Sequence, residues 1–211
     1  GADIITASAG TSNFRAGVNA GNSIESGGNY NVVVGDEAGT AITTGDFNVF
    51  VGYASGDGTT TSSNNTAVGY DSLTANTTGA NNVAVGALSL DANTTGDQNV
   101  ALGTSALGAL TAGDKNVAVG NSALAAFNVT DGSETFNTAV GYAAGGAVTT
   151  GVNNSIVGGL AGDAITTGDY NVALGMTALS TNTASNANVA IGGQALADFN
   201  VTTDTDTFNV A

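Results

Sequence analysis

Paired carboxylates are the side chains of this sequence best suited to chemistry. Two carboxyl groups held close together can divide the roles of general acid and general base. Three pairs have suitable spacing: Asp36 with Glu37, Asp131 with Glu134, and Asp204 with Asp206. The chain has no Cys and no His, so thiol nucleophiles and imidazole proton shuttles are excluded. Asp is also favoured in turns, where it bonds to nearby backbone. We therefore expect these pairs to be surface turn residues of a protein that is not an enzyme.

A second set of acidic residues recurs two positions before a repeated asparagine. Carboxylate oxygens are the ligands that calcium prefers. The four residues are Asp46, Asp97, Asp114 and Asp169. The chain contains neither an EF-hand loop nor the Gly-rich nonapeptide of calcium-binding β-helices. We therefore expect no cofactor and keep bound calcium as the alternative.

The charge balance excludes several classes of partner. Asp and Glu number 17 against 2 Lys and Arg, for a net charge of -15, which is the opposite of the basic surface that nucleic acid requires. No apolar run approaches the 18 or so residues that span a bilayer, so we expect no direct membrane insertion. The hydrophobic content of 42% indicates a folded chain, and only 9% of residues are charged. This composition predicts an extracellular, cell-surface or virion-surface location.

A five-residue motif recurs along nearly the whole chain: Asn, a small or β-branched residue, a small residue, an aliphatic residue, and Gly. Successive copies are 17 residues apart except for two steps of 21, and such a period is the signature of a solenoid. Seventeen residues are too few for two helices, whereas a second glycine turn, Thr-Thr-Gly, suits a β-coil. We predict an all-β, parallel β-solenoid (β-roll) of about twelve coils for the whole chain, with an irregular N-terminal coil or cap at 1–30 and the repeat domain at 31–211.

The asparagines at the heads of the coils are predicted to form a structural ladder. Each side-chain amide would donate to the amide oxygen of the next coil and so satisfy polar groups that are costly to bury. The ladder comprises Asn31, Asn48, Asn65, Asn82, Asn99, Asn116, Asn137, Asn154, Asn171, Asn188 and Asn209.

The two faces of the extended motif are predicted to differ in burial. Alternation places Val83 and Val85 on one face and Ala84 on the other. We expect the aliphatic fourth position, as in Val85, to stack into the core. The alanine column would then form an outer face that allows copies of the chain to approach closely, which predicts a homotrimer.

Two positions lie eight and eleven residues after each ladder asparagine. In most coils only one of them carries a large side chain, and which one it is varies from coil to coil. Leu73 is followed by Asn76, whereas Gly39 is followed by Ile42. A shared core slot explains the exchange, because one large side chain fills it from either position. Two coils break the rule, with an overfilled core predicted at Leu107 and Leu110 and an underfilled one at Gly56 and Thr59.

The two 21-residue coils are near copies of each other, at residues 125–136 and 197–208. Four additional residues predict a bulging loop, pinned by Phe127 against Phe136 and by Phe199 against Phe208. The loops are interpreted as tolerated insertions or, alternatively, as receptor contacts. The candidate contact residues are Phe127, Asp131, Glu134, Phe136, Phe199, Asp204, Asp206 and Phe208.

Residues 65–73 (NTAVGYDSL) and 171–179 (NVALGMTAL) resemble the head repeats of trimeric autotransporter adhesins. They are equally similar to the β-roll repeats of phage tail-fibre-type proteins. The resemblance covers residues 31–211 and implies left-handed parallel β-rolls in which three chains associate. It also implies projecting fibres that contact host surfaces.

The function predicted from these features is a structural or adhesive fibre segment on a cell or virion surface. Its shaft would be rigid, and several parallel chains would give multivalent host or surface attachment. The expected partners are further copies of the chain, as a homotrimer or filament, and a host-surface or matrix receptor. The last motif stops at residue 211, before its aliphatic residue and Gly, which favours continuing protein or a stacked subunit. The alternatives are a self-stacking extracellular filament subunit and a monomeric ligand- or ice-binding β-solenoid.

Overall fold

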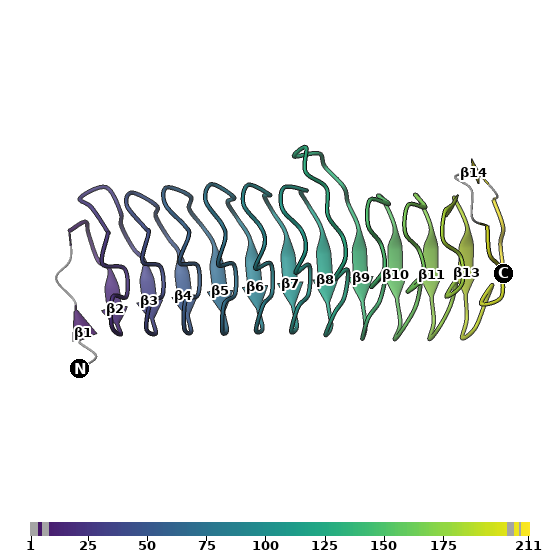
Figure 1. The fold of residues 1–211 in the computed structure, drawn as a ribbon, viewed down its shortest axis with the longest axis horizontal. Coiled ribbons are helices and arrows are strands. Elements are labelled where there is room, and N and C mark those ends of the chain that lie inside the picture. Colours follow the sequence, from purple (N-terminus) through teal and green to yellow (C-terminus); the bar gives the residue numbers. More distant parts are fainter. Residues whose placement is uncertain (1–3, 6–8, 202–204, 207) are drawn as a thin grey trace.

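The structure is a computed structural model that describes residues 4–5, 9–201, 205–206 and 208–211. Within these residues it contains strands and turns and no helix. Figure 1 shows the coils stacked along one axis as a rod, with one strand of each coil on the same side. The strands are β1 (Ile4–Ile5), β2 (Phe14–Ala16), β3 (Val32–Val34), β4 (Val49–Val51), β5 (Thr66–Val68), β6 (Val83–Val85), β7 (Val100–Leu102), β8 (Val117–Val119), β9 (Thr138–Val140), β10 (Ser155–Val157), β11 (Val172–Leu174), β12 (Ser185–Asn186), β13 (Val189–Ile191) and β14 (Thr205–Asp206).

A 12-stranded sheet runs along the rod in the order β1 to β11 and then β13. From β2 onward neighbouring strands are parallel, and each residue faces its equivalent in the next coil, as Val83 faces Val100. This arrangement confirms the predicted parallel β-solenoid. The terminal strand β1 pairs antiparallel with β2, while β12 and β14 form a separate parallel pair.

The glycine that closes each motif is required by its backbone conformation and by the next coil. Gly103 has a φ of 136°, in a region that side chains with a Cβ avoid. A Cβ added there would lie 2.5 Å from the carbonyl carbon and oxygen of Gly120. The chain can therefore turn after each strand only at glycine.

The inward face of the sheet carries the middle residue of each strand. In β6, Ala84 is fully buried, whereas Val83 is half-buried and Val85 is 38% exposed. The expectation that the fourth motif position forms the core is therefore wrong. The ladder asparagine before the strand is itself buried, so the alternation of a strand brings the third position inward and turns the second and fourth outward.

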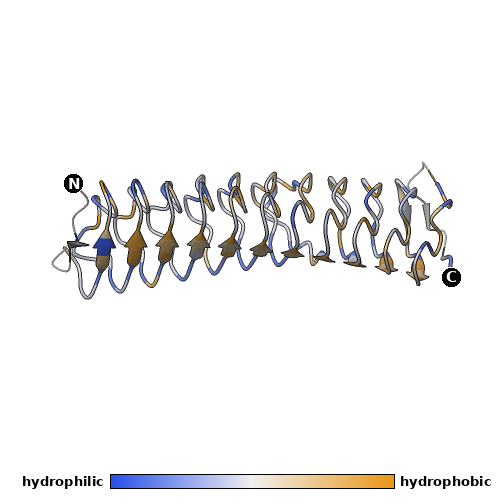
Figure 2. Cartoon of the chain, turned by 90° about the horizontal axis from the view of Figure 1, so that it is seen from below, coloured by the Kyte–Doolittle hydropathy of each residue, from blue (hydrophilic) through white to orange (hydrophobic). Residues whose placement is uncertain are grey.

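The predicted outer alanine face is wrong for the same reason. The alanines of this column are fully buried: Ala67, Ala84, Ala101, Ala118 and Ala139. The outward face instead carries pairs of mainly β-branched residues, and Figure 2 shows hydrophobic colour along most of the strands. Any close approach between copies of the chain must therefore use a face other than the alanine column.

The exchange of large side chains in the core slot holds at Gly39 with Ile42 but not in every coil, since Leu107 and Leu110 are both fully buried, as are Leu124 and Phe127. The expected underfilling at Gly56 is wrong. A Cβ on Gly39 would lie 2.8 Å from Ile42 Cδ1, so the isoleucine occupies the space that a leucine fills elsewhere. In the coil with Gly56 that space is filled by Phe50, whose ring carbons would lie 2.6 Å from an added Cβ. The compensating side chain comes from the strand rather than from the slot.

Phe50 and Gly56 are therefore expected to be strongly coupled. We expect Phe50→Ala to lower the free energy of unfolding by about 3–5 kcal/mol because it leaves a cavity. Adding Gly56→Leu should recover much of this loss, because the next coil combines Ala67 with a buried Leu73 at the same positions. Gly56 and Leu73 share a positive φ, 61° and 54°, so leucine fits the backbone there.

A double-mutant cycle in urea measures this coupling. Gly56→Leu alone should destabilise the protein, since its side chain meets the Phe50 ring. A double variant no more stable than Phe50→Ala would contradict the shared slot.

Candidate functional site

The ladder asparagines are buried and bonded from coil to coil. The Asn48 N–H donates to Asn31 Oδ1 at 2.9 Å, and the Asn65 N–H donates to Asn48 Oδ1 at 3.0 Å. The side-chain NH2 bonds to a turn glycine of the next coil, as Asn82 Nδ2 donates to Gly96 O at 2.8 Å. Each amide thus satisfies one backbone donor and one backbone acceptor.

The direction of the ladder differs from the sequence-based expectation. Where one amide donates to another, the donor belongs to the later coil: Asn116 Nδ2 donates to Asn99 Oδ1 at 3.0 Å. Asn13, in the degenerate first copy, also takes part and accepts from the Asn31 N–H at 2.8 Å. At the other end, Asn209 is only half-buried.

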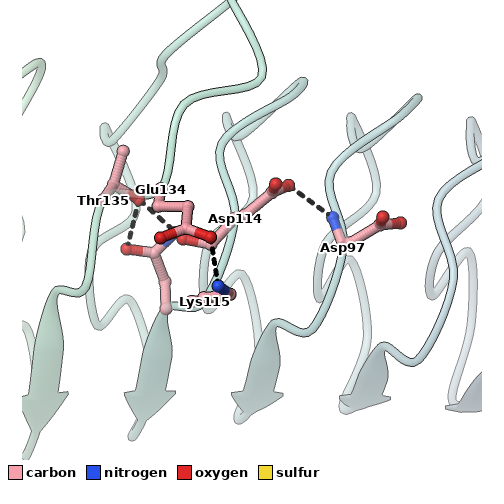
Figure 3. Close-up of polar contacts among 6 residues, drawn as sticks. Asp97, Asp114, Lys115, Glu134 and Thr135 are labelled. Atoms are coloured by element: carbon pink, nitrogen blue, oxygen red, sulfur yellow. Dashed lines mark hydrogen bonds and ion pairs between the residues drawn. The ribbon is translucent and has the colours of Figure 1, made fainter.

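The acidic residues considered for calcium form a second ladder with the opposite direction. Their Oδ1 atoms accept from the backbone N–H of the preceding coil, as Asp114 accepts from the Asp97 N–H at 2.7 Å (Figure 3). The other three accept in the same way: Asp46 from Asn29, Asp97 from Ala80, and Asp169 from Val152. Among the residues that the structure describes, no three His, Cys, Asp or Glu side chains gather where they could hold a metal ion.

The first candidate acid/base pair is also bonded to the preceding coil. Asp36 Oδ1 accepts from the Val18 N–H at 3.0 Å, and Glu37 Oε1 accepts from Asn19 Nδ2 at 2.8 Å. These bonds connect neighbouring coils at the surface. The pair Asp204 and Asp206 falls partly outside the described residues: Asp204 is not described, and Asp206 only as part of β14.

The second pair lies on the protruding loop between β8 and β9, which Figure 1 shows rising above the other coils. Asp131 accepts from the Ser133 N–H at 3.0 Å, and hydrogen bonding from the Ser133 side chain and backbone lowers the pKa of the Asp131 carboxyl. Glu134 instead forms an ion pair with Lys115 (Figure 3). Different partners therefore hold the two carboxylates.

The phenylalanines do not pin the longer loops as predicted. Phe127 is fully buried in the core, whereas Phe136 is 48% exposed and lies under the Lys115 ammonium, 5.4 Å from the ring centroid. In the second long coil, Phe199 packs against the core and Phe208 is exposed. One phenylalanine of each pair fills the core slot and the other remains available at the surface.

Each longer coil borders a shallow hollow. The first has a volume of about 370 Å³ and the second about 440 Å³, and hydroxyl and carboxylate groups line both. The first is lined by Asn128, Val129, Thr130, Asp131, Ser133, Thr150 and Val152. The second is lined by Thr177, Ser180, Thr181, Gln194, Ala197 and Asp198. The candidate loop residue Asp131 is thus part of a recess.

Exposed aromatic residues stack along the rod. The rings of Tyr30 and Phe47 are 5.0 Å apart and nearly parallel, and those of Tyr53 and Tyr70 are 5.7 Å apart. Each stack joins neighbouring coils just outside the strands, where aromatic contacts add about 0.5–1.5 kcal/mol. Within each stack, the ring face that points toward the other ring is therefore covered by it.

Three half-buried carboxyls lie nine residues after a ladder asparagine. Burial raises the pKa values of Asp57, Asp91 and Asp163, and the charges of Asp71 and Glu37 raise that of Asp57 further. One oxygen of Asp163, Oδ1, is buried without a hydrogen-bond partner. These groups are therefore more easily protonated in the folded chain than in the unfolded chain.

We expect these three carboxyls to make the protein more stable as the pH falls from 7 toward the ordinary Asp pKa of about 3.9. A raised folded-state pKa means that the folded state binds more protons, so its stabilisation is complete below the unfolded pKa and is lost as the pH rises through the folded pKa. Thermal unfolding at several pH values tests this, with Asp163→Asn as the control that should weaken the pH dependence. A melting temperature that falls steadily below pH 7 would contradict the assignment.

Comparison of the chain with protein-family models, curated proteins and solved structures found no match. No family is therefore assigned. The parallel β-solenoid is consistent with repeat-type fibre proteins. Within the described residues, no helix is long and apolar enough to cross a bilayer.

Sequence reasoning missed two features of this surface: the outward valine pairs and the aspartate ladder. The first would have followed from recognising that the ladder asparagine is buried, since strand alternation then assigns every other position. The second carried a signal in the recurrence of Asp two residues before the motif. That recurrence was interpreted as possible metal ligation rather than as backbone bonding.

Proposed function

We propose that this chain is a rigid segment of a structural or adhesive fibre, of the kind found in trimeric adhesin heads and phage tail fibres. The supporting observation is the continuous parallel sheet, in which ten parallel strands from β3 to β13 keep one register along the rod. Hydrogen bonds parallel to the axis join every coil to the next, so the rod bends or breaks only by disrupting many bonds together. Under this proposal the chain is not an enzyme, and it acts on a cell or virion surface.

Self-association as a homotrimer is part of this proposal, because parallel chains would combine weak contacts into firm attachment. Light scattering over a dilution series tests it. We expect a mass near three chains of 20.2 kDa each. A mass of one chain throughout would contradict the fibre, and a mass that grows with concentration would favour the alternative of a self-stacking filament subunit.

The loops of the two 21-residue coils are the proposed receptor contacts. The first projects beyond the other coils (Figure 1), carries exposed Asp131 and Glu134, and borders a recess. Removing residues 130–133 would return this coil to 17 residues while the ladder around it remains. We expect beads coated with this variant to lose attachment to cells that bind beads coated with the wild-type chain. Equal attachment at unchanged thermal stability would show that the loop is only an insertion.

A further inference from the structure

The outward face of the sheet is an apolar strip along the rod. We define this valine face as the first and third residues of strands β3 to β11 and β13. We propose that the valine face is the surface through which copies of this chain associate side by side. The inference rests on the proposed self-association and identifies its contact surface.

The valine face combines exposure with a lack of charge. Its positions are Val, Leu or Ile except for Thr66, Thr138 and Ser155. Several are well exposed, including Val85 at 38%, Leu174 at 44% and Ile191 at 57%. Apolar side chains at such exposure lose contact with water when covered, which is the main favourable term in protein association.

The size of the valine face meets the requirement of a specific contact. Ten strands at about 4.8 Å give a length of about 48 Å, and three residues with their side chains give a width of about 10 to 12 Å. The strip therefore covers about 500 Å² per copy, at the upper end of the apolar patches found on monomers. Two copies in contact would bury about 1,000 Å² in total, the lower limit for a specific interface.

Charge and periodicity indicate another copy as the occupant. The chain carries a net charge of -15, so two copies repel each other least where neither presents a charge, and the valine face has no charged position. A second copy also has the same coil-to-coil rise, so its side chains match along the whole rod.

Two matched pairs of substitutions test the valine face. The face variant combines Val85→Glu with Val157→Glu, at positions 38% and 37% exposed. The control combines Leu88→Glu with Leu160→Glu, three residues further along the same coils and 37% and 38% exposed. Both variants add two negative charges at equal exposure. Those of the control lie off the valine face, at residues with a positive φ of 57° and 55°.

Light scattering of the three proteins gives the result. We expect the wild type and the control to keep the same oligomeric mass, and the face variant to fall to 20.2 kDa, the mass of one chain. A face variant that keeps the wild-type mass overturns this inference and leaves the fibre proposal standing. A wild-type chain that is monomeric at every concentration removes the self-association on which both depend.

A second measurement applies if the face variant fails to fold. The chain contains no cysteine, so Val85→Cys and Leu88→Cys each introduce a single thiol. We expect maleimide to label Cys at position 85 at least tenfold more slowly in concentrated than in dilute protein, because association covers it. The thiol at position 88 should react equally in both. Equal labelling at both positions would overturn the inference.

Discussion

Replacement of Gly103 by alanine is expected to lower the free energy of unfolding by about 2–6 kcal/mol. The φ of 136° at this residue costs any residue with a Cβ about 1–3 kcal/mol. The added methyl group would also lie 2.5 Å from the Gly120 carbonyl, and overpacking of this kind adds about 1–3 kcal/mol. The obstructing atoms are backbone and belong to the next coil of a continuous sheet, so they cannot move aside without breaking its register.

Gly159→Ala is the matched control. This glycine also lies just after a strand, but its φ is not positive and a Cβ there would meet nothing within 4 Å. Alanine at such a site reduces the entropy of the unfolded chain and should be neutral or stabilising by up to about 1 kcal/mol. Urea unfolding of the two variants compares them directly. Similar effects at residues 103 and 159 would mean that the coils do not approach as closely as described.

Replacement of Asn99 by alanine is expected to destabilise the protein by about 3–5 kcal/mol. Asn99 Oδ1 accepts from the Asn116 backbone N–H at 2.9 Å and from Asn116 Nδ2 at 3.0 Å, and Asn99 Nδ2 donates to Gly113 O at 2.9 Å. All these groups are in the buried ladder. A buried polar group left without its partner costs about 1–3 kcal/mol, and alanine deprives the Asn116 N–H and the Gly113 carbonyl of theirs.

Gln98→Ala controls for composition and backbone. Gln98 precedes Asn99, is exposed, and makes its bond to Ala80 through its backbone N–H. Its loss should change the free energy of unfolding by less than about 0.5 kcal/mol, as is usual for surface positions. If Asn99→Ala unfolded in urea at the same midpoint as Gln98→Ala, the asparagines would not stabilise the rod.

The repeat period was sufficient to predict the fold because each coil has the same two tasks at the same positions. Gly103 and its equivalents must turn the chain, and Asn99 and its equivalents must satisfy buried backbone groups. Both requirements restrict residue type strongly, so they leave a visible pattern. The alternation of small and aliphatic residues showed that the strand has two faces.

The repeat pattern did not show which of the two strand faces points inward. Val85 is more hydrophobic and larger than Ala84, and hydrophobicity alone assigns the valine to the core. The interior of a 17-residue coil is narrow, however: a Cβ on Gly56, the equivalent of the buried Leu90, would lie 2.6 Å from the ring of Phe50, the equivalent of Ala84. Only a small residue such as Ala84 fits against that leucine, so size decided the facing rather than hydrophobicity.

Two local features also depended on contacts between positions that the repeat treats as unrelated. Phe50 compensates for Gly56 across the width of the coil, and Phe127 enters the slot instead of meeting Phe136. In both cases the sequence pattern associates the residue with positions near it along the chain. In the fold, the residue packs against a different part of the coil. Side chains of variable size at fixed positions are the signal that indicates such exchanges.

Small-angle X-ray scattering on the purified chain tests the central claim most directly, because it reports mass and length together. Side-by-side association through the valine face should give the mass of several chains at a maximum dimension that stays near the rod length, about 55–60 Å for a 12-stranded sheet with strands about 4.8 Å apart. A maximum dimension that grows in proportion to the mass would indicate stacking end to end. A particle of one chain, or one much shorter than the rod, would contradict the account.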